Sequence, residues 1–279
     1  MRLIKMTGGL GNQMFIYAFY LKMKKLFPHT KIDLSDMMHY HVHHGYEMNR
    51  VFALPHVEFC MNVRVRRYWS FCSSRLYWSA SRKDWSRSGK AMSGHWFTSK
   101  DFTSRNVFFA DIETDVRKAF TFDMTQASER SKEMAARMDA DLNAVSLHIR
   151  RGDYLEPKHW ENTGSVCQLP YYRNAIAAIK KELDNPVFYV FSDDLAWVKE
   201  NLPLDNAVYI DWNKGNDSWQ DMMLMSHCRR HIICNSTFSW WGAWLDPHKD
   251  KTVIVPERWF RHTETPYIYP EGWTKVPIN

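Results

Sequence analysis

The sequence predicts an α/β protein with parallel strands that alternate with helices, arranged in two domains. Three observations support this prediction. The chain has 279 residues, a length that suits two domains of ordinary size. It opens with an apolar strand, a glycine turn, a helix and a second strand, which is how a parallel sheet begins. In its second half, five apolar strands alternate with helical segments, the pattern of a doubly wound sheet.

In the first half, strands are expected at residues 2–6 and 31–35, and a helix is expected between them at 14–26. The glycine turn GGLGNQ joins the first strand to this helix. From residue 37 to about residue 105 no clear hydrophobic period is present, so loops and short helices are expected there.

The second half has a more regular pattern of apolar runs. The expected strands are residues 145–149, 187–192, 207–211, 231–235 and 252–256. The expected helices are residues 126–142, 171–183, 195–201, 219–228 and 239–245. A domain boundary is expected near residues 124–144, which gives an N-terminal domain at 1–143 and a C-terminal domain at 144–279.

The composition indicates a cytosolic protein with an unusual aromatic content. Aromatic residues make up 15% of the chain, and the 13 tryptophans indicate either a site that stacks flat rings or simple packing. The five cysteines are odd in number and form no C-x-x-C pair, so reduced thiols are expected rather than disulfides or a zinc site. No apolar run reaches 18 residues, so no transmembrane helix is expected.

The net charge of +6 is concentrated in residues 64–100, where basic and aromatic side chains are interleaved. Such a stretch could contact nucleic acid, an anionic membrane or a phosphorylated carrier. It could equally be a solvated surface above amphipathic helices.

Polar residues gather where the predicted strands end, which is where ligands bind in a doubly wound sheet. Strand 145–149 is followed by the segment RRGDY, and strand 187–192 by Asp193 and Asp194. Strand 231–235 leads into NSTFS at 235–239, just before a helix. The glycine turn at 8–13 follows the first strand.

Each of these segments could hold a phosphate, and each has a structural alternative. The N–H groups of the glycine turn suit an anion, but an ordinary turn is also expected, and G-x-G-x-x-G is absent. The paired arginines suit bidentate phosphate binding, although one of them is expected in a structural ion pair. The hydroxyls of NSTFS suit a phosphate, or plain N-capping by Ser236 or Ser239.

Four segments together resemble the α-1,2-fucosyltransferases, glycosyltransferase family 11. They are GGLGNQMF (8–15), HIRRGDY (148–154), FSDD (191–194) and NSTFSWWGAWL (235–245). The sequence departs from the family at Ile16, where glutamine is frequent. The resemblance implies a GT-B-like fold of two Rossmann-like domains with a cleft between them. It also implies an acceptor side in the N-terminal domain, a C-terminal domain that binds GDP-fucose, inversion at the anomeric carbon and no metal.

The H-x-R-R motif at 148–151 also resembles that of the α-1,6- and protein O-fucosyltransferases, and this resemblance implies roles for single residues. Arg150 would hold the donor β-phosphate, Ser239 would contact a phosphate, and His148 and Asp221 would contact guanosine. The expected donor site comprises Gly9, Gly11, Asn12, His148, Arg150, Asp193, Asp221, Asn235, Ser236, Thr237, Phe238 and Ser239.

Catalysis by inversion needs fixed charge for the leaving diphosphate and a general base for the acceptor hydroxyl. Arg150, Ser239 and the helix end after Phe238 are expected to meet that charge. Asp153 and Glu156 are the candidate bases, and Asn12 could orient the acceptor or the donor fucose. Alternatively, Asp153 braces Arg151 in a structural ion pair.

A metal site is not expected. His39, His41, His43 and His44 are dense, but they lie in an irregular stretch. Asp139 and Asp141 form a D-x-D sequence that is predicted to close a helix before a strand, whereas a metal-binding D-x-D follows a strand. No cofactor is expected, because GDP-fucose is a substrate.

The favoured hypothesis is transfer of L-fucose from GDP-β-L-fucose to the 2-hydroxyl of a terminal galactose. Alternatives are a basic, Trp-rich nucleic-acid-binding protein and a related transferase with another nucleotide sugar. The expected acceptor is a galactose-terminated oligosaccharide or glycolipid of an O-antigen or capsule. A cytoplasmic protein is expected, with the basic stretch 64–100 in peripheral contact with the anionic inner membrane face, and no nucleic-acid partner.

Overall fold

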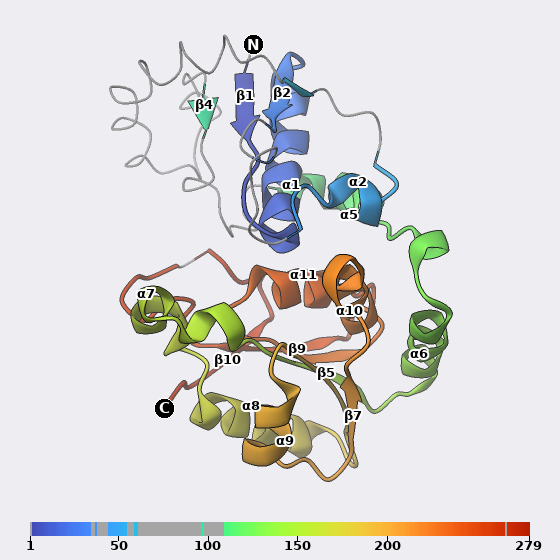
Figure 1. Ribbon diagram of the computed structural model, residues 1–279, viewed down its shortest axis with the longest axis vertical. Coiled ribbons are helices and arrows are strands. Elements are labelled where there is room, and N and C mark those ends of the chain that lie inside the picture. The colour runs from blue at the N-terminus through green and yellow to red at the C-terminus, as the bar shows by residue number, and fades with distance from the viewer. Residues whose placement is uncertain are drawn as a thin grey trace. The chain divides into compact units, whose positions relative to one another are not determined.

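The protein is built from two compact units, Met1–Thr121 and Phe122–Asn279 (Figure 1). The first unit ends before residue 143, the predicted end of the N-terminal domain. The computed structural model describes residues 2–34, 37, 44–54, 59–60, 96–97, 109–265 and 267–279. The basic stretch 64–100 therefore lies outside the described residues, apart from the backbone of 96–97.

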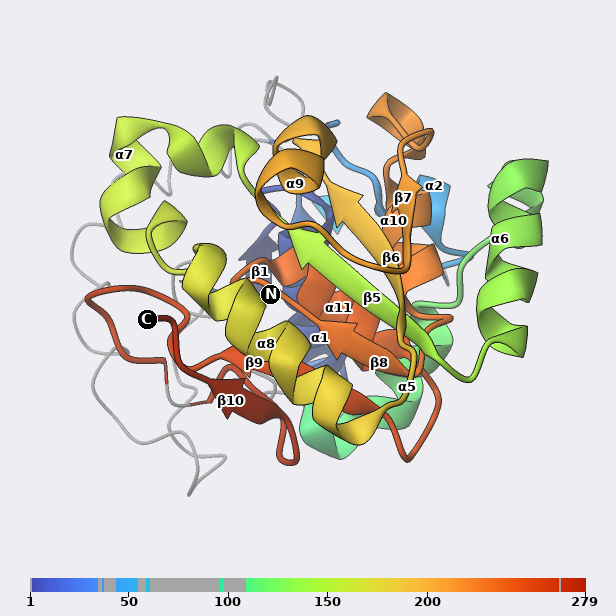
Figure 2. The same cartoon turned by 90° about the horizontal axis from the view of Figure 1, so that it is seen from below.

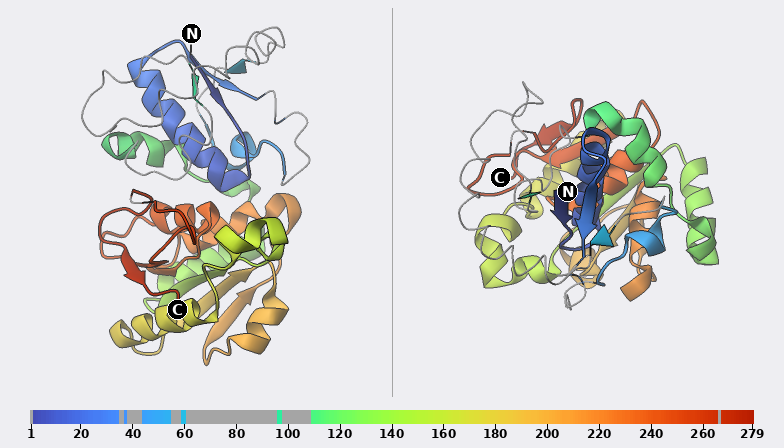
Figure 3. Two further views of the ribbon diagram at one scale, coloured as in Figure 1. Left: turned by 90° about the vertical axis from the view of Figure 1, so that its left-hand side faces the viewer. Right: turned by 90° about the horizontal axis from the view of Figure 1, so that it is seen from above.

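The first unit has a four-stranded parallel sheet in the order β3-β2-β1-β4. The strands are β1 (Arg2–Lys5), β2 (Thr30–Asp33), β3 (Phe59–Cys60) and β4 (Trp96–Phe97). Helix α1 (Leu10–Leu26) connects β1 to β2 and lies beside them (Figure 3). The remaining helices described here are α2 (Met48–Val51), the 3-10 helix η3 (Ala110–Ile112) and α5 (Glu113–Ala119).

Helix α1 begins earlier than the predicted start at Met14, because the glycine turn itself forms the first helical turn. Gly9 is the N-cap residue, with an extended backbone. Gly8 has a φ of +81°, and a Cβ atom there would lie 2.7 Å from Nδ2 of Asn12. Glycine is thus required at this position by both its conformation and its close neighbour.

The second unit has a six-stranded parallel sheet in the order β10-β9-β8-β5-β6-β7. The strands are β5 (Ala144–Ile149), β6 (Val187–Ser192), β7 (Ala207–Ile210), β8 (Arg230–Ile232), β9 (Thr252–Pro256) and β10 (Thr274–Val276). Counted from β5, this order is 3-2-1-4-5-6 read from β7 to β10, which is that of the Rossmann fold.

Helices cover both faces of this sheet. Helices α10 (Trp219–Met225) and α11 (Thr237–Leu245) cover one face, and α8 (Leu169–Glu182) and α9 (Leu195–Asn201) cover the other (Figures 1 and 2). The shorter helices of the unit are η4 (Met124–Gln126), η5 (Gly152–Leu155), α7 (Pro157–His159), the π-helix η6 (Trp160–Gly164) and η7 (Gly215–Asp217). Helix α6 (Glu129–Ala140) precedes β5. Central strands β5 and β6 are almost fully buried, which explains why apolar residues predominate in both.

The five strands and five helices predicted in this half are all present, with ends that differ by a few residues. The sixth strand, β10, was not predicted. Two of its three residues are exposed, and only Val276 is buried. An edge strand of this kind has no apolar run by which a sequence could reveal it.

The predicted position of the D-x-D sequence is confirmed. Asp139 lies in the last turn of α6, and Asp141 is its C-cap, just before β5. Asp139 contacts Nδ1 of His227 at 2.9 Å. Asp141 accepts hydrogen bonds from the Asn143 N–H at 2.9 Å and from the Tyr189 hydroxyl at 3.3 Å. Both carboxylates therefore have partners in the fold.

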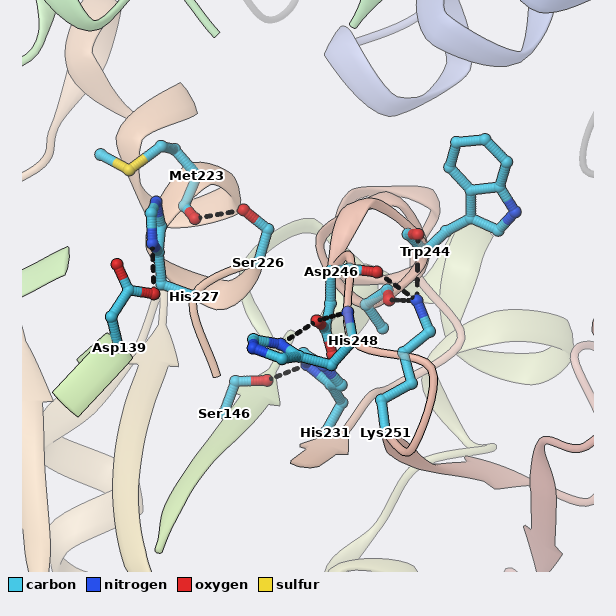
Figure 4. Close-up of polar contacts among 11 residues, drawn as sticks. Asp139, Ser146, Met223, Ser226, His227, His231, Trp244, Asp246, His248 and Lys251 are labelled. Atoms are coloured by element: carbon cyan, nitrogen blue, oxygen red, sulfur yellow. Dashed lines mark hydrogen bonds and ion pairs between the residues drawn. The ribbon is translucent and has the colours of Figure 1, made fainter. Parts of the chain in front are cut away.

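A buried polar network fastens the C-terminal end of α11 to strands β5 and β8 (Figure 4). His231 Nδ1 lies 2.8 Å from the Ser146 hydroxyl, and His231 Nε2 lies 3.0 Å from Oδ2 of Asp246. Asp246 also accepts the N–H of His248 at 2.8 Å and its Nδ1 at 2.6 Å. Lys251 Nζ donates to three carbonyl oxygens at this helix end, those of Ala243, Trp244 and Asp246.

The network favours neutral His231 and ionised Asp246. Burial lowers the pKa of His231 below its ordinary value, although Asp246 opposes this. Burial alone would raise the pKa of Asp246, but the hydrogen bonds from His231 and His248 outweigh burial and lower it. The unfolded chain binds more protons at both groups. The contribution of His231 is therefore lost as the pH falls below about 6.5, and that of Asp246 only as the pH falls below about 3.9.

We expect Asp246→Ala to lower the free energy of unfolding by about 3 kcal/mol or more at pH 7.5, because hydrogen bonds to a buried carboxylate contribute about 1.5–3 kcal/mol each. The difference from the wild type should widen at pH 5, because Asp246 is still ionised there and its removal lowers the pKa of buried His231 further. Urea unfolding at both pH values measures the free energy of unfolding. Asp250→Asn is the control, because Asp250 is exposed. Equal losses in the two variants would contradict the assignment.

Among the described residues, no helix combines the length and the apolar character that crossing a membrane requires.

Candidate functional site

The order of the second sheet places its topological switch point between β5 and β8. The chain leaves β5 and β8 toward opposite edges of the sheet, so a crevice is expected at their carboxyl ends, where doubly wound proteins bind ligands. Two of the predicted segments, 150–154 and 235–239, begin at these strand ends. FSDD ends β6, the neighbour of β5.

Arg150 follows β5 directly, and its guanidinium is held by two carboxylates. Asp153 Oδ1 accepts from Nε at 2.9 Å and lies 2.7 Å from Nη2. Asp193 Oδ2 lies 3.0 Å from Nη1. Burial alone would lower the pKa of Arg150, but Asp193 and Asp153 outweigh it and raise the pKa. The Arg150 side chain is 32% exposed, so a charged and fixed guanidinium remains within reach of a ligand.

Arg151 has a structural position. Its Nε lies 3.1 Å from Oδ2 of Asp194, and its guanidinium lies 3.6 Å from the ring centroid of Trp197. Its backbone N–H donates to Asp193 Oδ1 at 2.8 Å. The expectation that one of the paired arginines is a structural ion pair fits Arg151. The alternative, in which Asp153 braces Arg151, does not agree with the structure, because Asp153 pairs with Arg150 and Arg151 pairs with Asp194.

Gly152 allows Asp193 to approach this loop. A Cβ atom at residue 152 would lie 2.6 Å from Oδ2 of Asp193, the oxygen that contacts Arg150. A larger residue would push this carboxylate away. In this structure Asp193 contacts the two arginine residues, and its predicted contact with a donor stays a prediction.

The two candidate bases differ in their surroundings. Asp153 lies in η5, and its side chain is 37% exposed while it pairs with Arg150. Glu156 is exposed, and its Oε2 lies 2.7 Å from Nζ of Lys158. The hydrogen bond to Glu156 raises the pKa of Lys158.

His148, the fifth residue of β5, is buried and neutral. Burial, with the Arg150 charge as a second cause, lowers the pKa of His148 to about 3. Its Nδ1 lies 3.2 Å from Sγ of Cys234, and its ring centroid lies 5.9 Å from that of Phe238. Burial raises the pKa of Cys234 to about 12, so the pair is a neutral imidazole and a thiol. His148 thereby links the end of β5 to the start of α11.

The N-terminus of α11 combines capping with exposed positions. Ser236 is the N-cap, and its hydroxyl accepts the Phe238 N–H at 3.3 Å. Thr237 and Phe238 are half-buried. Ser239 is buried, and its hydroxyl donates to the Ser236 carbonyl at 3.4 Å. N-capping by Ser236 is therefore present, and the positive end of the helix dipole lies at this turn.

Asn235 connects this turn to the loop that carries Asp153. Its Nδ2 donates to the carbonyls of Thr163 and Trp259, both at 3.0 Å, and its own carbonyl accepts the Tyr154 hydroxyl at 3.0 Å. Its Oδ1 is buried without a partner among the described residues. Asn235 thus ties the end of β8 to the backbone at Thr163 and Trp259 and to the Tyr154 side chain.

Asp221 lies in the first turn of α10, after the carboxyl end of β7. Its Oδ1 accepts a 2.8 Å hydrogen bond from Nδ2 of Asn213. Burial raises the pKa of Asp221 to about 7, although the bond from Asn213 opposes this. A carboxylate of this kind changes its charge near neutral pH.

The predicted residues of the glycine turn, Gly9, Gly11 and Asn12, belong to the first unit. Their turn is held by Gln13, which the sequence reasoning did not select. The buried Gln13 amide donates to the carbonyls of Gly8 at 2.9 Å and Gly45 at 2.7 Å, and it accepts the Glu47 N–H at 3.0 Å. The roles of Gly9, Gly11 and Asn12 toward a substrate stay predictions.

The profile of the family described as Glycosyl transferase family 11 matches residues 4–276. This chain belongs to glycosyl transferase family 11. The predicted family resemblance is confirmed, and the chain is a glycosyltransferase. A match of this extent covers both units and does not favour the nucleic-acid alternative.

Curated relatives support the family over the length of the chain. The Alpha-1,2-colitosyltransferase of Escherichia coli is 31% identical over 98% of this chain and 97% of its own. The O-antigen biosynthesis glycosyltransferase WbnK of Escherichia coli is 39% identical over 49% of this chain and 45% of its own. Galactoside alpha-(1,2)-fucosyltransferase 1 of Lagothrix lagotricha is 26% identical over 85% of this chain and 63% of its own.

The fold of this family 11 chain is also that of a solved fucosyltransferase. NodZ from Bradyrhizobium matches with a TM-score of 0.51 over 88% of this chain and 94% of its own, at 14% identity. The predicted GT-B-type α/β fold is confirmed by this likeness and by the two parallel sheets.

The second unit of this family 11 protein thus brings together most of the predicted donor residues. Arg150, Asp153 and Asp193 form one ion cluster, and His148 links it to α11 through Cys234 and Phe238. Sequence reasoning missed Tyr154, although it is the last residue of the HIRRGDY segment. It also missed Cys234, since a single cysteine in a strand carries no pattern.

The parts of the chain that the structure describes contain no group of three or more His, Cys, Asp or Glu side chains that could hold a metal ion. His39, His41 and His43 lie outside those parts, and only His44 of that cluster is described.

Proposed function

We propose that this chain transfers L-fucose from GDP-β-L-fucose to the 2-hydroxyl of a terminal galactose, with inversion. The observation that carries the proposal is the position of Arg150. Its charged, partly exposed guanidinium follows β5 at the switch point of a Rossmann sheet, in a family 11 chain. Guanidinium groups bind phosphate oxygens in bidentate fashion, and a diphosphate is the leaving group of a nucleotide sugar.

The proposed reaction is a single displacement. The galactose 2-hydroxyl attacks the anomeric carbon of the β-linked fucose, GDP leaves from the opposite face, and the product is α-linked. Arg150 and the N-terminus of α11 would stabilise the charge that develops on the diphosphate. Ser239 could join them only if its hydroxyl turned away from the Ser236 carbonyl.

The acceptor hydroxyl must lose its proton as the bond forms. Asp153 is the proposed base, because it lies on the loop that carries Arg150, three residues farther along. Glu156 is the reserve candidate, and its exposed side chain pairs with Lys158. Asn12 is proposed, from the sequence alone, to orient the acceptor or the donor fucose.

A second candidate donor sugar is colitose, because the relative matched over 98% of this chain is named an alpha-1,2-colitosyltransferase. Colitose is L-fucose without the 3-hydroxyl. An enzyme built to hydrogen-bond that hydroxyl rejects the analogue that lacks it, whereas the reverse discrimination is weak. The ratio of kcat/KM for the two GDP sugars therefore separates the candidates.

We expect transfer from GDP-fucose to a β-galactoside such as lactose, with full activity in excess EDTA. The proposed leaving-group stabilisation uses arginine and helix N–H groups, so it needs no metal. NMR of the product should show an α-linked fucose on the galactose 2-oxygen. Loss of activity in EDTA that Mn²⁺ restores would overturn metal independence, and preference for GDP-colitose would establish the second candidate.

A binding experiment tests the nucleotide separately. GDP should raise the melting temperature, and UDP at the same concentration should not. At a hundredfold excess over Kd, stabilisation amounts to about 2.7 kcal/mol, which is readily measured. Equal stabilisation by the two nucleotides would count against GDP-linked sugars as donors.

A further inference from the structure

A chain of three hydrogen bonds leads from Trp212, through Ser131 of α6, to Asp221. The Trp212 indole Nε1–H donates to the Ser131 hydroxyl at 3.0 Å. The Ser131 hydroxyl donates to Oδ1 of Asn213 at 3.0 Å. Asn213 Nδ2 then donates to Oδ1 of Asp221 at 2.8 Å. The chain ends on Asp221, the carboxylate for which the family resemblance implies a contact with guanosine.

The direction of this chain is fixed by its first member. An indole N–H can only donate, so the Ser131 oxygen must accept from Trp212. The serine proton is then left for Oδ1 of Asn213. Because the amide oxygen faces Ser131, the amide NH₂ group must face Asp221. Asn213 therefore presents a donor to Asp221, which favours the ionised carboxylate.

The surroundings hold this arrangement in place. Ser131 is fully buried, and Asn213 is 8% exposed. The Ser128 N–H and hydroxyl both donate to the Gln220 side chain, at 2.9 and 3.0 Å, which fixes α6 beside α10. The Arg130 guanidinium lies 3.7 Å from the ring centroid of Trp212. The amide therefore has little freedom to turn over.

We propose that Asn213, oriented by Ser131 and Trp212, is a positioning residue that sets the Asp221 carboxylate to accept hydrogen bonds from a guanine base. This inference rests on the proposed function. Guanine offers two adjacent donors, N1–H and the 2-amino group, which match the two oxygens of an ionised carboxylate. Adenine and uracil lack this pair of donors, so the arrangement selects GDP among nucleoside diphosphates.

The charge of Asp221 supports a pH-dependent test. With a pKa raised to about 7 by burial, Asp221 is ionised mainly above neutral pH. The charged groups on the neighbouring segments are Arg130, Asp211, Lys214 and Asp217. Arg130 is itself 3.8 Å from Asp211. Burial raises the pKa of Asp221 and the hydrogen bond from Asn213 lowers it, so the test removes the Asn213 donor.

The experiment is calorimetric titration of the full chain with GDP from pH 5.5 to 8.5. Wild-type affinity should rise with a midpoint near pH 7, as Asp221 ionises. Asn213→Leu removes the donor that favours the ionised form, so the midpoint should move upward by about one pH unit. Affinity would then fall about tenfold at pH 6 and less than twofold at pH 8.5. Ser131→Ala should shift the midpoint in the same direction by less.

Asn201→Leu is the matched control, because the Asn201 amide donates within α9 to the Trp197 carbonyl at 3.0 Å. The pH midpoint of GDP binding in Asn201→Leu should equal that of the wild type. An equal loss of GDP affinity at every pH in Asn213→Leu would show a merely structural role and overturn the inference. The inference would also be overturned if the pH midpoint of GDP binding stayed unchanged in both Asn213→Leu and Ser131→Ala. If the wild type binds no GDP at any pH, the proposed function fails instead.

Discussion

Arg150→Ala is expected to slow transfer about a hundred- to a thousandfold, because removal of one fixed donor to a developing oxyanion costs about 3–4 kcal/mol of transition-state stabilisation. The structure adds a reason for so large an effect. Asp153 and Asp193 hold the guanidinium from two sides, so it needs little reorganisation when the diphosphate charge develops. Steady-state kinetics with GDP-fucose and a β-galactoside, together with the melting temperature, measure the change.

Two further variants serve as controls. Arg150→Lys should recover only part of the rate, since an ammonium cannot reproduce the planar fork of donors. Arg151→Ala should lower the melting temperature instead, because Arg151 bonds Asp194 and stacks on Trp197. If Arg150→Ala keeps more than about a tenth of the wild-type rate, the role of Arg150 at the diphosphate is wrong.

The alternation of strands and helices in the second unit could be predicted because of how a parallel sheet is buried. Helices cover both faces of this sheet, so strands such as β6 are continuous apolar runs that stand out in a sequence. Strand β10 has two exposed residues among its three and could not be recognised in this way. The prediction therefore succeeded for the centre of the sheet and failed at its edge.

In the candidate site, the sequence was enough to select the residues, but not to predict which side chains they pair with. Arg150 and Asp153 are three residues apart, and the 3-10 helix η5 begins between them. A turn of three residues brings such side chains to the same side, which favours Asp153 as the partner of Arg150 over Arg151. Only the conformation of this loop decides between the two pairings, and the sequence contains no signal for it.

Hydrogen-bond partners that are distant in sequence could not be predicted either. Asn213 and Ser131 meet across the packing of α6 against the loop after β7, and Gln13 meets Gly45 and Glu47 across another loop. Asn213 belongs to no motif, and the position of Gln13 in the GGLGNQ segment does not reveal its partners. Their amides matter because burial leaves polar groups dependent on each other, and burial is a property of the fold.

Asp153→Asn is expected to lower the rate of transfer by a factor of about 10²–10⁴, the usual contribution of a general base. The substitution keeps the size of the side chain and an oxygen that can still accept from Arg150, whose Nε is 2.9 Å away. It removes only the charge and the ability to take a proton. The rate, the melting temperature and the Kd for GDP measured on the same protein identify the cause of any loss.

The sign of the change in GDP affinity separates the two roles of Asp153. If Asp153 is the base, GDP should bind at least as well to the variant, because a negative charge next to the proposed diphosphate site has been removed. If Asp153 mainly braces Arg150, GDP affinity and melting temperature should fall together with the rate. Glu156→Gln is the matched control, since Glu156 is an exposed carboxylate paired with Lys158 on the same loop. A nearly normal rate in Asp153→Asn with a large loss in Glu156→Gln would transfer the role of base to Glu156.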